Sequence, residues 1–391
     1  MKRWKTPTLR GGIALILLAL GIVMLASASS VRGATFRTSH FDPLFFFKRQ
    51  FVWLVVGLIT AAAAVAMDYR RLKPLAWIMG GVAIAMLLLV LIPGIGTKIG
   101  GSSRWFRIGG FSFQPSELAK FAMVVALARW LAENRMRMNN GLQGFILPLL
   151  FLAPVWVLIF AEPDLGTTIL VVAVGVLLLF LGGTRPVYLG ILIVGLVLMV
   201  ALVVWIGWDN PKVQHRIARI VAFVDPARYP DLAYQGEQSQ QAFTMGGFFG
   251  RGLGESLQKH FYLPESHTDF ILAIIGEELG IIATAGVVVL FSALFLAGIT
   301  IAIHAPDDFG RYLGMGLTLM IAVQALINVG VVVGCLPTKG LPLPFISYGG
   351  SSLLMSMLSV GVLVSIARHS QAASVPIGQP SNNIQDLVHR F

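Results

Sequence analysis

Charged residues are scarce in this chain of 391 residues, and cysteine is almost absent. Only 12% of the residues are charged, whereas 56% are hydrophobic, and the mean hydropathy is +0.80. A composition this apolar excludes both a soluble globular domain and a disordered chain. The single cysteine, Cys335, excludes an internal disulfide and leaves packing as its expected role.

Several familiar motifs are also missing. The glycines of 246–254 have no strand before them and no Gly-Lys-Ser/Thr ending, so no nucleotide site is expected. No Gly-x-Ser-x-Gly elbow occurs, and His267 and Asp269 are two residues apart at a helix start, where they do not face each other. These facts exclude a Ser-His-Asp triad. The sequence has no repeat period of the kind found in solenoids and no matching halves of the kind found in inverted-repeat transporters. No nucleic-acid partner is expected.

Long hydrophobic runs dominate what is present. About 20 apolar residues suffice to cross a hydrocarbon core of about 30 Å. The fold class predicted is therefore all-α, a polytopic membrane protein with a bundle of ten transmembrane helices. The ten predicted spans are 11–30, 50–67, 75–93, 117–132, 143–161, 166–183, 187–206, 279–301, 313–333 and 349–367.

Positive charges give the predicted orientation. Lys2, Arg3, Lys5 and Arg10 precede the first run, which is too long for a cleaved signal peptide, so the N-terminus is predicted to be cytoplasmic. Ten crossings return the C-terminus to the same side. We therefore predict a single membrane domain over residues 1–370 and a flexible cytoplasmic tail over 371–391.

The outer side is predicted to carry a long loop, about 207–268, between helices 7 and 8. It contains an amphipathic stretch, 213–224, and enough aromatic residues to fold against the bundle. Fourteen Lys/Arg fall in inner segments, fourteen in outer segments, and Lys120 in a span. Two explanations stay open: long loops escape the orientation rule, or the outer face binds an anion such as a lipid-linked phosphate.

Asp269 is the first candidate for chemistry. It precedes an apolar run, 270–303, whose 34 residues would make a helix of about 51 Å, longer than a bilayer crossing. Glu277 and Glu278 lie in its outer third, so lipid is predicted to begin around Leu279. A carboxylate such as Asp269 is then expected on a helical extension or broken segment that lines a wet outer cavity.

Two pairs of charged residues have both structural and functional interpretations. Glu117 and Lys120 are spaced for an ion pair within a helix, or Lys120 could meet a phosphate. Asp164 is a favoured helix N-cap, or with Glu162 it could hold a divalent cation or a sugar hydroxyl. Two acidic residues are too few to specify a metal site. Arg104, beside Trp105, is either an interface anchor or part of the site.

Two polar segments complete the candidates. The amides around Gln238 fit the hydroxyls and carbonyls of sugars and peptides, or they belong to a re-entrant turn. Three prolines in 336–352 break the helix after span 9, and this stretch must be buried in protein or line water. Lys339 would then face the same outer cavity as Asp269, although keeping the shape of the chain is an alternative role.

Five motifs in order resemble the SEDS family, which contains FtsW, RodA and SpoVE. The resemblance covers about residues 11–368, and its Pro-Thr-Lys-Gly stretch is more similar to the FtsW branch. Ser266 departs from the alanine that many members carry. The motifs are Arg104-Trp105 with Gln114-Pro115-Ser116-Glu117; Glu162-Pro163-Asp164-Leu165-Gly166; Leu263-Pro264-Glu265-Ser266-His267-Thr268-Asp269-Phe270; Pro337-Thr338-Lys339-Gly340; and Ile346-Ser347-Tyr348-Gly349-Gly350-Ser351-Ser352.

The resemblance implies a ten-span fold with both ends cytoplasmic and a peptidoglycan glycosyltransferase activity on lipid II. It places the catalytic carboxylate at Asp269 and the family's helix-four lysine at Lys120. It also implies a class B penicillin-binding protein as the transpeptidase partner, other division-complex membrane proteins, and a place in the bacterial inner membrane at the division septum. The expected substrate-binding residues are Arg104, Glu117, Lys120, Asp164, Gln238, His267, Thr268, Lys339, Ser347 and Ser351.

The hypothesis for the mechanism is inverting glycosyl transfer with Asp269 as general base. The departing undecaprenyl pyrophosphate needs cations, supplied by Arg104, Lys120, Lys339, Arg216 and Arg219, or by a divalent ion such as Mg²⁺ or Mn²⁺. The metal ligands are unknown. The alternatives are a lipid II flippase, an elongation-type polymerase like RodA, and a non-catalytic scaffold for division proteins.

Overall fold

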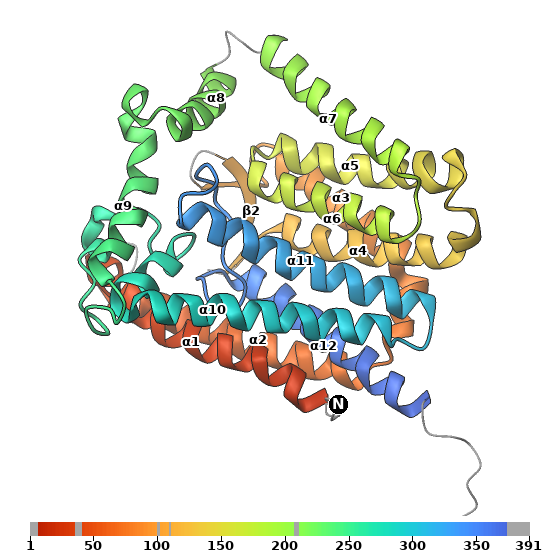
Figure 1. Ribbon diagram of the computed structural model, residues 1–391, viewed down its shortest axis with the longest axis horizontal. Coiled ribbons are helices and arrows are strands. Elements are labelled where there is room, and N and C mark those ends of the chain that lie inside the picture. Colours follow the sequence, from red (N-terminus) through yellow and green to blue (C-terminus); the bar gives the residue numbers. More distant parts are fainter. Residues whose placement is uncertain (1–6, 36–40, 100–101, 109–110, 207–210, 374–391) are drawn as a thin grey trace, which may run out of the picture.

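The computed structural model describes residues 7–35, 41–99, 102–108, 111–206 and 211–373. Most long helices run roughly side by side along the horizontal axis of Figure 1, and α1 begins on the same side of the bundle as α12 ends. The long helices are α1 (Pro7–Thr35), α2 (Phe45–Ala66), α3 (Leu72–Leu91), α4 (Pro115–Asn134), α5 (Leu147–Ala161), α6 (Leu165–Leu181), α7 (Pro186–Ile206), α10 (Ile271–Ile303), α11 (Asp308–Val332) and α12 (Gly350–Ala373).

Each of the ten predicted hydrophobic spans lies within or largely overlaps one of these helices, so the all-α polytopic class is confirmed. Among the described residues, seven helices are long and apolar enough to cross a membrane, and α6 and α7 are shorter apolar helices. The charged pair in α4 lowers its hydropathy. The predicted number of ten membrane crossings therefore stays a prediction.

Two contiguous hydrophobic cores hold the bundle together. One joins side chains of α3, α4, α5, α6 and α11, and the other joins α1, α10, α11 and the segment before α12. Helix α7 is different, because most of its described side chains are exposed and it stands off the bundle (Figure 1). A helix that is apolar on all sides and largely exposed is suited to lipid rather than to water.

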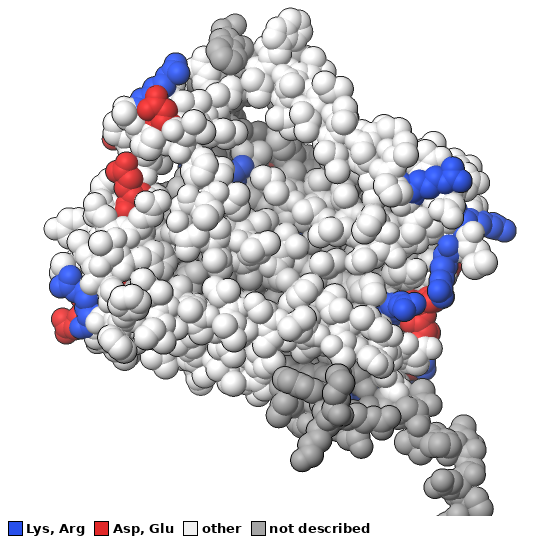
Figure 2. Space-filling model, viewed as in Figure 1, with Lys and Arg blue, Asp and Glu red and all other residues white. Residues whose placement is uncertain are grey.

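Charge marks the two ends of the bundle. In Figure 2, acidic and basic side chains gather at the left and right ends of the molecule, and a broad uncharged belt lies between them. This belt is what a hydrocarbon core requires. We call the left end, where α9 and the segment before α10 lie, the loop-rich end; the sequence predicts that it faces outward.

A small antiparallel sheet at the loop-rich end was not predicted. Its strands are β1 (Thr97–Ile99), β2 (Ser102–Ile108) and β3 (Phe111–Phe113), in the order β1-β2-β3. Lys98 faces Ser103 across the first pair and Arg107 faces Ser112 across the second. The sheet carries Arg104 between the end of α3 and the start of α4.

The long predicted loop is largely helical. It contains α8 (Pro211–Val224), the turn η5 (Pro226–Arg228), α9 (Pro230–Gly246) and the turn η6 (Gln258–Tyr262). The amphipathic stretch predicted over 213–224 coincides with α8, which packs on α9, and α9 packs on α10. Folding of this segment against the bundle is thus confirmed for α9. Most of the predicted tail, 374–391, lies outside the described residues.

Helix α10 is broken where the sequence predicted that lipid begins. Gly280 has φ +84° and ψ 176°, a conformation essentially restricted to glycine. A Cβ at this position would lie 2.3 Å from the Phe248 carbonyl oxygen, so the close approach of the 248–250 backbone also requires glycine. Residues 271–278 before the kink are all buried in protein.

The stretch before α12 is non-helical and buried, as the three prolines predicted. Leu343, Phe345 and Ile346 are inaccessible, and Gly21 of α1 approaches the Phe345 carbonyl so closely that any side chain would collide with it. Gln50 of α2 binds the same stretch through the Ser347 carbonyl oxygen and the Gly349 N–H. Neighbouring helices therefore satisfy the backbone that the prolines leave without helical partners.

Candidate active site

Asp269 is held in a turn between a polar loop and α10. The backbone N–H groups of Thr268 and Phe270 both donate to the Glu265 carbonyl oxygen, at 3.2 and 3.3 Å. Asn328 of α11 then fixes the turn from outside, because its amide nitrogen donates to the carbonyl oxygens of Asp269 at 2.8 Å and of Leu341 at 2.7 Å. One buried amide thus ties the Asp269 turn to the segment before α12.

The Asp269 carboxyl group packs against glycine. A Cβ added to Gly340 would lie 2.9 Å from Asp269 Oδ2, so the backbone at 340 approaches the carboxyl group from one side. The side chain keeps partial access to solvent, but protein surrounds most of it. This burial, reinforced by the negative charges of Glu265 and Asp164 and opposed by Arg104, raises the pKa of Asp269 to about 7.

Arg104 and Asp164 form an ion pair near this carboxyl group. Arg104 Nη1 of β2 lies 3.2 Å from Asp164 Oδ2, and Asp164 is only 4% exposed. Gln114, the residue before α4, approaches the same oxygen at 3.4 Å. The other carboxylate oxygen accepts the Thr167 N–H at the start of α6, so the predicted N-cap is confirmed. Asp164 therefore both caps a helix and pairs with a cation.

Glu162 is the most unusual group that sequence reasoning left out of the site. It is completely buried, and among the described residues neither of its carboxylate oxygens has a hydrogen-bond partner. Burial and the neighbouring Asp164 charge raise its pKa to about 8, against the effect of Arg104. A carboxyl group in such surroundings holds its proton at neutral pH. The sequence shows two acidic residues, one on each side of Pro163. It does not indicate which of the two, Glu162 or Asp164, is protonated in the folded protein.

The Glu117–Lys120 ion pair exists and is buried. Lys120 Nζ lies 2.9 Å from Glu117 Oε1 and 2.8 Å from Gln324 Oε1 of α11, and Lys120 is 2% exposed. Gln324 in turn donates to the Pro342 carbonyl oxygen at 2.8 Å. Lys120 is thus connected, through one glutamine, to the segment that carries Gly340.

His267 and Thr268 are held by structural contacts. The His267 ring is buried between the rings of Phe46 and Tyr348, with centroids 4.7 and 5.8 Å away. Burial and the Arg32 charge lower its pKa to about 4, so the imidazole is neutral at pH 7. Thr268 Oγ1 donates to Glu265 Oε2 at 3.0 Å. These two residues shape the turn that presents Asp269.

The two candidate serines also make structural hydrogen bonds. Ser347 Oγ accepts the Leu343 N–H at 2.8 Å, within the non-helical stretch. Ser351 Oγ, at the start of α12, accepts the Gln114 N–H at 3.1 Å. Through Gln114, Ser351 is connected to the Arg104–Asp164 pair.

The remaining candidates are less closely connected to Asp269. Lys339 is half-buried and precedes Gly340, whose backbone lies close to the carboxyl group. Gln238 lies on α9, which covers the 332–338 segment through the hydrogen bond from Ser239 to Val332. Arg219 is exposed on α8, which packs on α9, and the side chain of Arg216 lies outside the described part of the chain.

No metal site is formed by protein ligands alone in the described structure, since no three His, Cys, Asp or Glu side chains of the described residues converge. Asp269, Asp164 and Glu162 therefore do not fit a dedicated divalent-cation cage, which takes several oxygen ligands.

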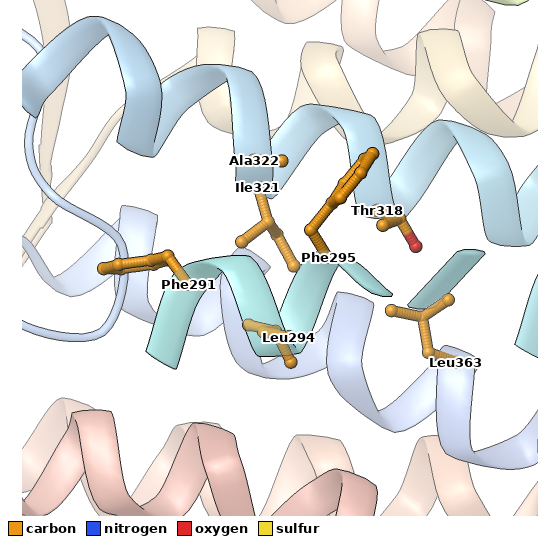
Figure 3. Close-up of a pocket in the computed structure, with 7 residues that line it drawn as sticks. All are labelled: Phe291, Leu294, Phe295, Thr318, Ile321, Ala322 and Leu363. Atoms are coloured by element: carbon orange, nitrogen blue, oxygen red, sulfur yellow. The ribbon is translucent and has the colours of Figure 1, made fainter. Parts of the chain in front are cut away.

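A cavity inside the bundle has no groups suited to chemistry. It lies between α10, α11 and α12, and Figure 3 shows apolar side chains around it. Its one polar lining group, Thr318 Oγ1, donates to the Gly314 carbonyl oxygen of the preceding turn. The polar cluster around Asp269 therefore stays the candidate active site. The cavity is lined by Phe291, Leu294, Phe295, Thr318, Ile321, Ala322 and Leu363.

Two known proteins are similar to this chain over nearly its whole length. A protein of Geobacter sp. (strain M18) named "Probable peptidoglycan glycosyltransferase FtsW" is 41% identical over 93% of this chain and 96% of its own length. Stage V sporulation protein E of Bacillus subtilis (strain 168) is 40% identical over 92% of this chain and 96% of its own length.

Two solved structures have the same fold. A chain in "Structural coordination of polymerization and crosslinking by a peptidoglycan synthase complex" matches with a TM-score of 0.73 and 29% identity, over 92% of this chain and 97% of that one. The rod shape determining protein RodA of Thermus thermophilus matches with a TM-score of 0.67 and 27% identity, over 92% of this chain and 96% of that one. The family model described as "Cell cycle protein" matches residues 8–372. The chain therefore belongs to the FtsW, RodA and SpoVE family.

Proposed function

We propose that this chain is a peptidoglycan glycosyltransferase that polymerises lipid II into glycan strands on the outer face of the bacterial inner membrane. The names of its relatives support this activity, and the FtsW name among those at about 41% identity supports a role in septal wall synthesis. The single observation on which the proposal depends is the position of Asp269, a carboxyl group with a pKa near 7 beside an arginine–aspartate pair.

In the proposed reaction Asp269 acts as general base. Its carboxylate accepts the proton of the 4-hydroxyl group of the acceptor sugar, and the hydroxyl oxygen attacks the anomeric carbon of the growing strand. The bond from that carbon to the diphosphate oxygen breaks, and undecaprenyl pyrophosphate leaves with the bonding electrons. Attack from the opposite face inverts the anomeric centre. A positioned base of this kind contributes about 10²–10⁴-fold to the rate.

The diphosphate needs positive charge as it leaves. Arg104 is the best-placed cation: it is partly accessible, and its pair with Asp164 lies close enough to affect Asp269. Lys339 is the second, because it adjoins Gly340. Lys120 is buried in its pair with Glu117, so we assign it an indirect role through Gln324. A divalent cation would have to take most of its ligands from the substrate.

The Asp269→Ala variant tests the proposal. In a purified complex with its penicillin-binding partner, the rate of polymer formation from lipid II should fall at least about 10²-fold, since the base is lost. Asp231→Ala is the matched control, because Asp231 is exposed on α9. Normal glycan strands from a well-folded Asp269→Ala protein would refute the assignment.

A class B penicillin-binding protein is the partner that we propose, as the transpeptidase. The similar solved structure is described as a complex that combines polymerisation and crosslinking, which supports such a pairing here. Two alternatives, a lipid II flippase and an elongation-type polymerase, are separated by experiment. Polymer made from lipid II already on the outer leaflet excludes a flippase alone, and midcell localisation of a fluorescent fusion separates septal from elongation synthesis.

A further inference from the structure

Two phenylalanines at the turn between α9 and α10 are unusually exposed. Phe248 is 70% exposed and Phe249 85%, and they follow Gly247 and precede Gly250, both with positive φ. Single exposed apolar residues are common on proteins, but two adjacent aromatic rings at the tip of a turn form a patch that avoids water. We call residues 247–250 the Phe turn.

The Phe turn is fixed to α10 by backbone hydrogen bonds. The Ile281 N–H donates to the Gly247 carbonyl oxygen at 2.9 Å, and the Arg251 N–H donates to the Glu277 carbonyl oxygen at 3.0 Å. Gly250 and Gly280 approach each other so closely that a Cβ on either would collide with the opposite backbone. The two rings therefore have a defined height relative to the kink in α10.

The Phe turn lies at the level where the membrane-length part of α10 begins. From Ile281 to Ile303 the straight part of α10 has a length of about 35 Å, close to the roughly 30 Å of a hydrocarbon core. Ile281 and Ile282, the first residues after the kink, are 45% and 56% exposed. The Phe turn, hydrogen-bonded to these residues, thus continues the lipid-facing surface of α10 at its loop-rich end.

We propose that the Phe turn inserts Phe248 and Phe249 into the bilayer interface of the outer leaflet, beside Ile281 and Ile282. Aromatic rings at the level of the headgroups anchor membrane proteins in this way. Arg251, exposed at the next position, would direct its guanidinium toward lipid phosphates while its aliphatic part stays at the interface.

The anchor also sets the height of the neighbouring loop. Ser256 Oγ donates to the buried carboxylate of Glu277. Lys259 Nζ lies 3.0 Å from Oε1 of the buried Glu278. Membrane insertion of the Phe turn would therefore hold residues 254–262 at a constant level above the bilayer. This inference depends on the membrane-spanning fold and not on the glycosyltransferase activity.

Site-directed spin labelling tests the anchor in the full chain. Cys335 is the only cysteine, so a Cys335→Ser background accepts single labels at Phe248→Cys and Phe249→Cys in lipid nanodiscs. Ile282→Cys is the lipid-exposed control and Asp231→Cys, exposed on α9, the aqueous control. The measurement is the collision rate of each nitroxide with oxygen, which concentrates in lipid, and with a water-soluble nickel chelate.

We expect both labels in the Phe turn to resemble the Ile282 label, with nickel accessibility several-fold below that of the Asp231 label and higher oxygen accessibility. Nickel accessibility equal to that at Asp231 would show that the turn projects into water. Low accessibility to both reagents would show that protein, such as a partner's helix, covers it. Either of these results overturns the proposal, and two label positions guard against local misfolding at one of them.

Discussion

At the scale of single residues, three carboxyl groups close to one arginine differ in their surroundings. Asp164 pairs directly with Arg104, Glu162 is buried without a hydrogen-bond partner among the described residues, and Asp269 is partly accessible beside Gly340. Such differences separate the pKa values of neighbouring acids and thereby their roles. Asp269, with a pKa of about 7, is the one that exchanges a proton in the proposed reaction.

The pH dependence of the reaction follows from the raised pKa of Asp269, about 7. A general base must be deprotonated, so the rate should rise with pH and level off above pH 7, with about a tenfold loss for each pH unit well below that value. The measurement is the initial rate of polymerisation at low lipid II concentration across this range. A rate that stays constant down to pH 5 would mean that Asp269 keeps an ordinary aspartate pKa or is not the base.

Glu162→Gln should change how stability depends on pH. The pKa of Glu162 is raised to about 8, so the folded protein keeps a proton that the unfolded chain releases above its ordinary pKa of 4.5. Wild-type stability should therefore fall as pH rises from about 4.5 to 8, and the glutamine variant should lack that part of the loss. Thermal midpoints in detergent at pH 5 and pH 8 measure it.

Glu237→Gln is the matched control, since Glu237 is exposed on α9. It should follow the wild-type pH dependence. If the midpoints of Glu162→Gln also shift with pH by the same amount as those of the wild type, Glu162 does not hold its proton in the folded state.

At the scale of elements, the kink in α10 connects the membrane to the candidate site. The helix after Gly280 is long enough to cross the bilayer, while the segment before it is buried and leads back to Asp269. The buried acids Glu277 and Glu278 occupy the turn before the kink, where their partners come from the loop 256–259 and, for Glu278, also from Ser27 of α1. Of the two expected alternatives, a helical extension or a broken segment, the structure has the broken segment, and its acids face protein instead of lipid.

Two glycines of α10 provide a matched pair for testing the kink. Gly280→Ala places a Cβ 2.3 Å from the Phe248 carbonyl oxygen and forces a strained backbone, which alone costs about 1–3 kcal/mol. Gly286→Ala meets no atom within 4 Å and should be neutral or slightly stabilising. Thermal midpoints of the two purified variants should thus differ clearly, and equal midpoints would refute a rigid kink.

At the scale of the whole molecule, the sequence predicts which end of the bundle faces the cytoplasm, and this orientation can be tested. The positive residues before the first span predict a cytoplasmic N-terminus, and the even number of predicted spans places the loop-rich end outside. Cys335 reports on this directly, because it is the only cysteine and is exposed, so the packing role expected from the sequence is wrong. It follows α11, whose end lies at the loop-rich end.

A membrane-impermeant maleimide should label Cys335 in right-side-out membrane vesicles without disruption of the bilayer. Cys335→Ser should not be labelled. Arg311→Cys in that background, near the start of α11 at the opposite end, should react only after the vesicles are opened. The reverse pattern would invert the topology and place Asp269 on the cytoplasmic side.

Local features of the site were predictable from the sequence to a large extent. The Glu117–Lys120 pair and the Asp164 cap depend on spacings of three residues along the chain, and both are present. The short strands of 97–113 were missed because they have only three to seven residues and lack a long alternating pattern. The contacts of the amides Gln114, Gln324 and Asn328 were missed as well, since their partners come from distant segments.

The sequence by itself determined which stretches enter the membrane, where the helices break and which acids are available, because hydropathy, proline and glycine act locally. Only the tertiary structure decided which of these acids is paired, which is buried without a partner and which stays accessible. Lys120 and Gln324, for example, are 204 positions apart but 2.8 Å from each other. The pKa of a carboxyl group depends on its neighbours in space, and packing of distant helices places those neighbours.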